Sequence, residues 1–277
     1  LAHDAEFVVN RLAAARGGGS RSRWSAVEAR REAQALRAVD RVWTLTGEDA
    51  DALAASSGVP RARFDVMPFG IDLAALTPPD SPPAGPDAAP APDPVVLFFG
   101  AFVADFNRDA LDWLLAEIWP ALRRLAPGAQ LRVAGSGLDA AGAARVREAG
   151  GSYLGAVEDV RALYAGAAVV LIPLRFGGGL RIRLLEALAC GRAIVATPVG
   201  IGGIEGQAGT HYAVADDAEG LARAAASLLD DPARARALGA AGRRLVEERY
   251  ALPVARQGIR DLAAAAAAAP ETATARL

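Results

Sequence analysis

A strand, a glycine-rich loop and a helix follow one another in residues 169–190, which read Val-Val-Leu-Ile-Pro-Leu-Arg-Phe-Gly-Gly-Gly-Leu-Arg-Ile-Arg-Leu-Leu-Glu-Ala-Leu-Ala-Cys. The apolar run at 169–173 is typical of a strand that is buried on both faces of a parallel sheet. Three glycines at 177–179 end this run, and residues 180–190 carry apolar side chains at helical spacing. We therefore predict one strand, loop and helix unit of a parallel sheet here.

The same alternation extends in both directions from this unit. Apolar and helical patterns predict strands at 95–99, 130–134, near Tyr153 and at 194–196, and helices at 109–125, around Arg145, at 157–165, 219–229 and 234–248. Strands that alternate with helices at this spacing imply βαβ crossovers. The predicted fold class is therefore α/β, with a doubly wound parallel sheet.

A stretch rich in Pro, Ala, Asp and Gly at 77–94 divides the chain. We predict an interdomain linker there, a domain at 95–250, and a helix with a disordered tail at 251–277 whose Ala-rich part frays after about Asp261. Before the linker, residues 1–76 alternate between helix and strand as well: we expect a helix at 25–39, a strand at 41–45, a helix capped by Thr46 and a strand at 63–68. This alternation begins midway, so we expect a fragment of a longer protein.

Composition excludes several classes of protein. The net charge is −2, so no global field attracts nucleic acid. All 30 Lys and Arg residues are Arg, a bias that makes each extra arginine a weak indication of a phosphate site. One cysteine, Cys190, and two histidines exclude an internal disulfide and give too few ligands for a structural zinc site. No apolar run is long enough to span a bilayer, and we expect a cytoplasmic protein.

The glycine-rich loop at 177–179 is the candidate binding site. Glycines allow a ligand close to the backbone, and free N–H groups at the start of a helix bind anions. Arg175, Arg181 and Arg183 flank these groups and have the fork geometry that binds a diphosphate, while Glu186 can accept hydrogen bonds from a ribose diol. The alternative is a simple tight turn, with Arg183 and Glu186 as a surface ion pair three residues apart on a helix.

These residues, together with their order in the chain, carry a resemblance to a known family. Residues 173–197, followed by Gly200-Ile-Gly-Gly-Ile-Glu205, resemble the sugar-donor-binding signature of family 4 glycosyltransferases, which have the GT-B fold of two Rossmann-like domains. Further matches stand in the family's order over 95–250: Gly100, Asn107-Arg-Asp-Ala110, Ile118-Trp-Pro120 and Val133-Ala-Gly-Ser-Gly137. Before the linker, three segments resemble the end of the N-terminal, acceptor-side domain: His3-Asp-Ala-Glu6, Asp40-Arg-Val-Trp-Thr44 and Phe69-Gly-Ile-Asp72.

The resemblance implies a role for each matching residue. Glu186 would hold the ribose of the donor, and the backbone at 177–179 would hold the diphosphate with Arg181 and Arg183. The family pattern also places Gly100, Leu180 and Arg175 at the donor, Gly155 and Val157 beside the base, and His3 across from the transferred sugar. The implied catalytic residues are His3, Arg181 and Glu186. For His3 the alternative is a polar residue satisfied at the end of a strand, and we expect His211, which has no match, to be structural.

Two departures from the family pattern concern the sugar and the phosphates. Many relatives have a Glu eight residues before the ribose-binding Glu, where this chain has Gly178. Many also have an Arg after the first strand of this domain and a Lys one turn later, whereas Gly100-Ala101-Phe102 offers neither. Neutralisation of the diphosphate therefore depends on Arg175, Arg181 and Arg183.

The resemblance implies transfer of a sugar from a nucleotide-diphosphate donor to an acceptor, with retention of configuration. It implies no cofactor and no essential metal, and the one Asp-X-Asp, at Asp49 and Asp51, falls in a predicted helix. The acceptor is a sugar, a lipid-linked molecule or a protein, envelope or polysaccharide synthesis is the expected process, and peripheral membrane association is a further expectation. Two alternatives stay open: a nucleotide-sugar epimerase on the same fold, and a non-catalytic nucleotide-sugar-binding domain.

Overall fold

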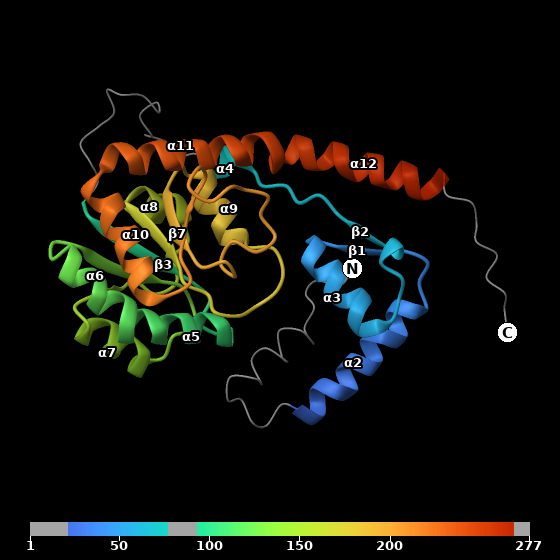
Figure 1. Ribbon diagram of the computed structural model, residues 1–277, viewed down its shortest axis with the longest axis horizontal. Coiled ribbons are helices and arrows are strands. Elements are labelled where there is room, and N and C mark those ends of the chain that lie inside the picture. The colour runs from blue at the N-terminus through green and yellow to red at the C-terminus, as the bar shows by residue number, and fades with distance from the viewer. Residues whose placement is uncertain (1–21, 77–92, 269–277) are drawn as a thin grey trace.

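A six-stranded parallel sheet forms the centre of the larger part of the chain (Figure 1). The computed structural model describes residues 22–76 and 93–268. Six strands follow in chain order: β3 (Val95–Phe99), β4 (Gln130–Ala134), β5 (Ser152–Tyr153), β6 (Val169–Ile172), β7 (Ala193–Ala196) and β8 (Ala213–Val214). Their spatial order is β5-β4-β3-β6-β7-β8, and all pairs are parallel. The doubly wound parallel sheet is confirmed, and its order reverses between β3 and β6, where such folds bind ligands.

Alternating side chains of the central strands pack on opposite faces of this sheet. In β3, Val96 and Phe98 join one core while Leu97 joins the other. In β6, Leu171 and Val170 divide in the same way. Because both faces are covered, the strands are nearly all apolar, which is why short apolar runs in the sequence predicted them.

Helices cover the two faces. One core includes side chains from α5 (Asp105–Trp113), the π-helical turn η2 (Leu114–Ile118), α6 (Trp119–Leu125) and α10 (Ala218–Asp230). The other includes α8 (Val160–Ala165), α9 (Ile182–Ala189) and α11 (Pro232–Arg249), and α7 (Ala140–Glu148) lies against β5. The helix predicted at 109–125 starts four residues earlier and has a π turn in its middle. Pro120 at the start of α6 has no N–H to donate, which favours this interruption.

The N-terminal part is smaller and has its own parallel pair of strands. It consists of α2 (Ser22–Arg37), β1 (Val42–Thr44), α3 (Gly47–Ser57), the 3-10 turn η1 (Arg61–Arg63), β2 (Phe64–Val66) and α4 (Leu73–Leu76). The N-cap predicted at Thr46 is confirmed, because its side chain accepts the N–H of Asp49.

The last helix joins the two parts (Figure 1). Helix α12 (Leu252–Ala268) follows α11 and extends toward the N-terminal part, so the chain stays helical past Asp261 instead of fraying there. At its start the Ile71 N–H donates to the Tyr250 carbonyl (2.7 Å), and the Leu252 N–H donates to the Ile71 carbonyl (3.2 Å). The predicted linker lies almost wholly outside the described residues, His3 lies outside them entirely, and the predicted tail is described only as far as Ala268. Within 22–76 and 93–268, no helix has the length and apolar character needed to cross a membrane.

Candidate functional site

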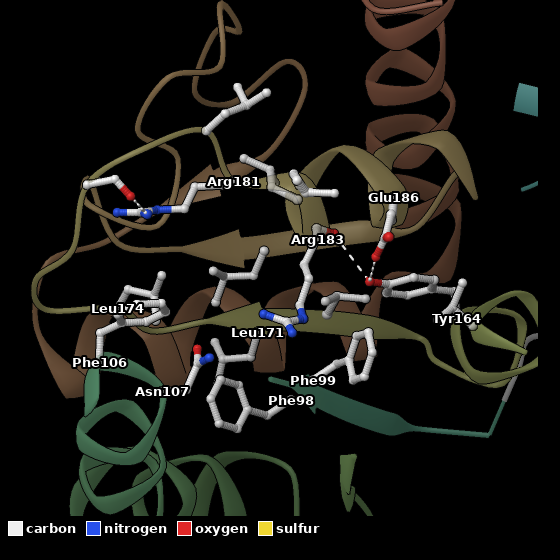
Figure 2. Close-up of a pocket in the computed structure, with 17 residues that line it drawn as sticks. Phe98, Phe99, Phe106, Asn107, Tyr164, Leu171, Leu174, Arg181, Arg183 and Glu186 are labelled. Carbon is white, nitrogen blue, oxygen red and sulfur yellow. Dashed lines mark hydrogen bonds between the residues drawn. The ribbon is translucent and has the colours of Figure 1, made fainter. Parts of the chain in front are cut away.

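A cavity of about 760 Å³ lies where the strand order reverses (Figure 2). Its floor is formed by the ends of β3 and β6, with Phe98, Phe99 and Leu171. Its wall is the loop after β6 and the first turns of α9, from Gly178 to Glu186. We call this cavity the pocket. Its volume is in the range of small-molecule sites, and its place is the one that doubly wound sheets use for ligands.

Arg183 places a positive charge inside the pocket. Figure 2 shows its guanidinium between Asn107 and Phe99, and its central carbon lies 5.0 Å from the centroid of the Phe99 ring. Throughout the described part of the chain, no carboxylate forms an ion pair with Arg183, so the surface pair with Glu186 that the sequence left open is not formed. The pocket therefore offers a cation to an anionic ligand.

Glu186 lies one turn further along α9, with its carboxylate beside the hydroxyl of Tyr164. This hydroxyl donates to Oε2 of Glu186 (3.2 Å) and is itself part of a fully buried side chain. Burial raises the pKa of the Glu186 carboxyl above its usual value, and the Tyr164 and Arg183 side chains offset only part of that effect. A half-buried carboxylate with an oxygen left for a second donor is suited to accept hydrogen bonds from a diol.

Arg181 lies at the other end of the pocket from Glu186 (Figure 2). Its Nη1 donates to the Gly178 carbonyl and its Nε donates to the Val199 carbonyl (3.2 Å). Arg175 is placed differently: it donates to both carboxylate oxygens of Asp109, lies 5.3 Å from the Trp113 ring centroid, and does not line the pocket. The diphosphate role predicted for Arg175 is untested, and its charge already has a partner.

Two glycines of the loop have positive φ angles, which glycine adopts readily. Gly177 and Gly179 have φ of 129° and 78°, values that side chains other than hydrogen disfavour. Helix α9 starts after Arg181 with no side-chain cap on its first N–H groups. Gly178 and Leu180 line the pocket, while Gly179 is buried and does not line it.

Three further predicted residues, Gly100, Gly155 and Val157, do not line the pocket. Gly100 follows β3 directly, and a Cβ there would come within 3.0 Å of the Asn107 side chain. Gly155 has φ of 73° with open space beside it, and Val157 is half-buried against the core below α8. His3 lies outside the described residues. His211 accepts the Gln207 N–H in a turn before β8, a structural contact.

The sequence did not indicate two residues that contact the site. Tyr164 reaches Glu186 across 22 positions, and only its place in a helix pattern was visible. Asp49 was set aside as a helix residue, yet its Oδ1 accepts the N–H of Gly179 (3.2 Å). Its spacing from Thr46 is that of a capping box, the one local signal that gives it a role.

The sequence model of the family named Glycosyl transferases group 1 matches residues 93–231, half of the chain. The chain belongs to this family. A D-inositol 3-phosphate glycosyltransferase of Nocardia farcinica is 32% identical over 236 residues, which are 75% of this chain and 49% of that protein. The chain spans less than half the length of the curated relatives it matches.

Two solved structures share the fold of this glycosyl transferase family member. Sucrose-phosphate synthase of Thermosynechococcus elongatus has a TM-score of 0.70 at 23% identity, covering 95% of this chain and 67% of that one. The HepE protein of Anabaena, in a crystal structure with UDP and glucose, has a TM-score of 0.67 at 15% identity, covering 86% and 67%. The GT-B fold and the family 4 assignment are thereby confirmed.

Proposed function

We propose that this chain carries the sugar-donor site of a glycosyltransferase that takes a sugar from a nucleotide-diphosphate donor. The observation that carries the proposal is the order of charges along the pocket, with the carboxylate of Glu186 at one end, the cation of Arg183 between, and Arg181 beside Gly178 at the other end. A ribose at Glu186 would direct the diphosphate toward the two arginines and the start of α9. Family membership supports the same chemistry.

The chemistry proposed for these residues is stabilisation of the leaving group. When the bond between the sugar and the diphosphate breaks, negative charge develops on the diphosphate, and fixed cations and N–H groups lower the energy of that state. Arg183 and Arg181 would supply the cations. Retention of configuration and independence from a metal are part of the proposal and rest on the family resemblance. Arg183 is the group whose loss would reduce catalysis most, since its guanidinium lies in the pocket between Asn107 and Phe99, whereas that of Arg181 donates to the Gly178 and Val199 carbonyls.

UDP is the first nucleotide to test, because HepE was crystallised with UDP and glucose. The acceptor, a role in envelope or polysaccharide synthesis, a cytoplasmic location and peripheral membrane association belong to the whole protein and are proposed on the resemblance alone. The epimerase alternative predicts a free epimer without an acceptor. The non-catalytic alternative has one observation in its favour, Gly178 in place of the Glu of many relatives, and predicts binding without turnover.

The test is a calorimetric titration of the purified chain with UDP, GDP and ADP. We expect one of them to bind in the micromolar range, and Glu186→Ala and Arg183→Ala each to weaken binding by about 1.5 to 3 kcal/mol, as for a hydrogen bond to a charged group. Glu148→Ala and Arg147→Ala remove the same side chains from exposed positions of α7 and serve as controls. A folded sample that binds none of the three nucleotides, or variants that bind as well as the parent, would refute the assignment.

A further inference from the structure

One peptide unit of the glycine-rich loop is held at both ends by charged side chains. The Gly179 N–H donates to Oδ1 of Asp49 (3.2 Å), and the Gly178 carbonyl accepts from the guanidinium of Arg181. The N–H and C=O of a trans peptide point in opposite directions. A carboxylate at the N–H and a guanidinium at the carbonyl oxygen therefore both interact favourably with the peptide dipole. This peptide thus connects Asp49 to Arg181.

Asp49 is itself held firmly by the N-terminal part. Its side chain is buried, its Oδ2 accepts from the Thr46 hydroxyl (2.6 Å), and its N–H donates to the oxygen of that hydroxyl (3.0 Å). Behind it, a Cβ at Gly203 would come within 2.5 Å of the Thr46 methyl group, so the start of α3 lies tightly against the larger part of the chain. An immobile carboxylate can fix the group that it bonds.

A capping role alone does not account for this arrangement. In a capping box the acidic side chain accepts the backbone N–H of the capping residue. Here Oδ1 accepts the N–H of Gly179, 130 positions away in the chain, and Oδ2 accepts the Thr46 hydroxyl. The carboxylate therefore serves the glycine-rich loop as well as the helix.

We propose that Asp49 is a positioning residue of the sugar-donor site, which holds the Gly178–Gly179 peptide and, through it, the guanidinium of Arg181 at the edge of the pocket. The inference rests on the proposed function for the part that Arg181 plays toward a diphosphate. Its consequence is that the phosphate end of the site is assembled from both parts of the chain. The ribose end, at Glu186, does not depend on Asp49.

The test compares UDP with uridine by calorimetry on the parent chain and on Asp49→Ala, Asp49→Asn, Arg181→Ala and the Asp49→Ala/Arg181→Ala double variant. We expect Asp49→Ala to weaken the binding of UDP about five- to tenfold and the binding of uridine less than twofold, because only the phosphates would contact Arg181. Asp49→Asn keeps a hydrogen-bonding side chain, so its loss of UDP affinity should be about half that of Asp49→Ala on a logarithmic scale. The double variant should be no weaker than Arg181→Ala alone, since the two act as one unit.

Glu48→Gln is the matched control, because it removes one negative charge from an exposed position in the same turn of α3. Amide hydrogen exchange gives a readout that needs no ligand. The Gly179 N–H should exchange faster in Asp49→Ala than in the parent chain, and at the parent rate in Glu48→Gln. Equal losses for UDP and uridine, additive effects of the two substitutions, or unchanged exchange at Gly179 would overturn the role of Asp49. A parent chain that binds no nucleotide would instead overturn the proposed function, whatever the exchange of Gly179 shows.

Discussion

Glu186 combines a binding role with a cost in stability. Because burial raises the pKa of its carboxyl, the folded chain keeps a proton at pH values where the unfolded chain has released it. Stability must then fall as the pH rises through the interval between the usual pKa and the raised one, and the full penalty remains at neutral pH. The group that we propose to bind the ribose thus destabilises the empty fold.

We predict that Glu186→Gln stabilises the empty chain at pH 7 to 8 while it weakens nucleotide binding. The amide carries no charge to desolvate and can still accept from Tyr164, so the melting temperature should rise by about 1–2 °C, the effect of a fraction of a kcal/mol. Thermal melts between pH 4 and pH 8 measure this, with Glu148→Gln as the exposed control. The gain should shrink toward pH 4, and a gain that grows on acidification would contradict a raised pKa at Glu186.

Cys190 should be unreactive in the folded chain. Burial raises the pKa of its thiol to about 11, and the thiol donates a hydrogen bond to the Leu76 carbonyl (3.2 Å). Only the thiolate reacts, so at pH 8 we expect modification by a disulfide reagent to be at least about a hundredfold slower than in denaturant. Absorbance of the released thiolate measures both rates on one sample. Rapid release of one equivalent from the native chain would show that this part of the fold opens readily.

At the scale of elements, the ends of β3 and β4 approach so closely that a side chain does not fit between them. Gly135 has φ of 131°, and a Cβ there would come within 1.7 Å of the Gly100 carbonyl oxygen. Gly135→Ala should therefore cost about 2–4 kcal/mol, from backbone strain and overpacking together. Urea unfolding measures the loss. Gly128→Ala, at a turn with open space around it, is the control and should stay within about 0.5 kcal/mol of the parent.

The same elements show how far the sequence could lead. The strands at 95–99 and 130–134 were predicted to the residue. Burial on both faces makes the first an unbroken apolar run, whereas the second has buried apolar residues at Leu131, Val133 and Ala134 around a half-buried Arg132. Strand β8 was missed, because its two residues are only half-buried and its pairing with β7 depends on tertiary structure that the local sequence does not show. The same limit applies to the site. Arg183 and Glu186 lie three residues apart on one helix, so their spacing in the sequence could indicate a shared ligand. The partners of Arg175 and Gly179 lie 66 and 130 positions away, so local sequence could not predict those contacts.

At the scale of the whole molecule, the two parts meet along α12 as well as at Asp49. The backbone of Ile71 bonds to Tyr250 and Leu252 at the start of this helix, and Gly70 packs beside it. A Cβ at Gly70 would come within 2.7 Å of the Ala255 methyl group and within 3.1 Å of the Leu252 Cα. Helix α12 therefore fixes the N-terminal part, and with it Asp49, against the larger part of the chain.

We predict that Gly70→Ala weakens UDP binding although it lies far from the pocket along the chain. The added methyl group must push α12 or residues 68–71 away, at about 1–3 kcal/mol of stability, and this displaces Asp49 from Gly179. Calorimetry should show a severalfold loss of UDP affinity in the parent background and little further loss in Asp49→Ala, because the bridge is then already absent. Gly47→Ala, which meets no atom within 4 Å, is the control. If Gly70→Ala lowers stability and leaves UDP affinity unchanged, the contact between Asp49 and Gly179 survives loosening of α12, and the two junctions between the parts act independently.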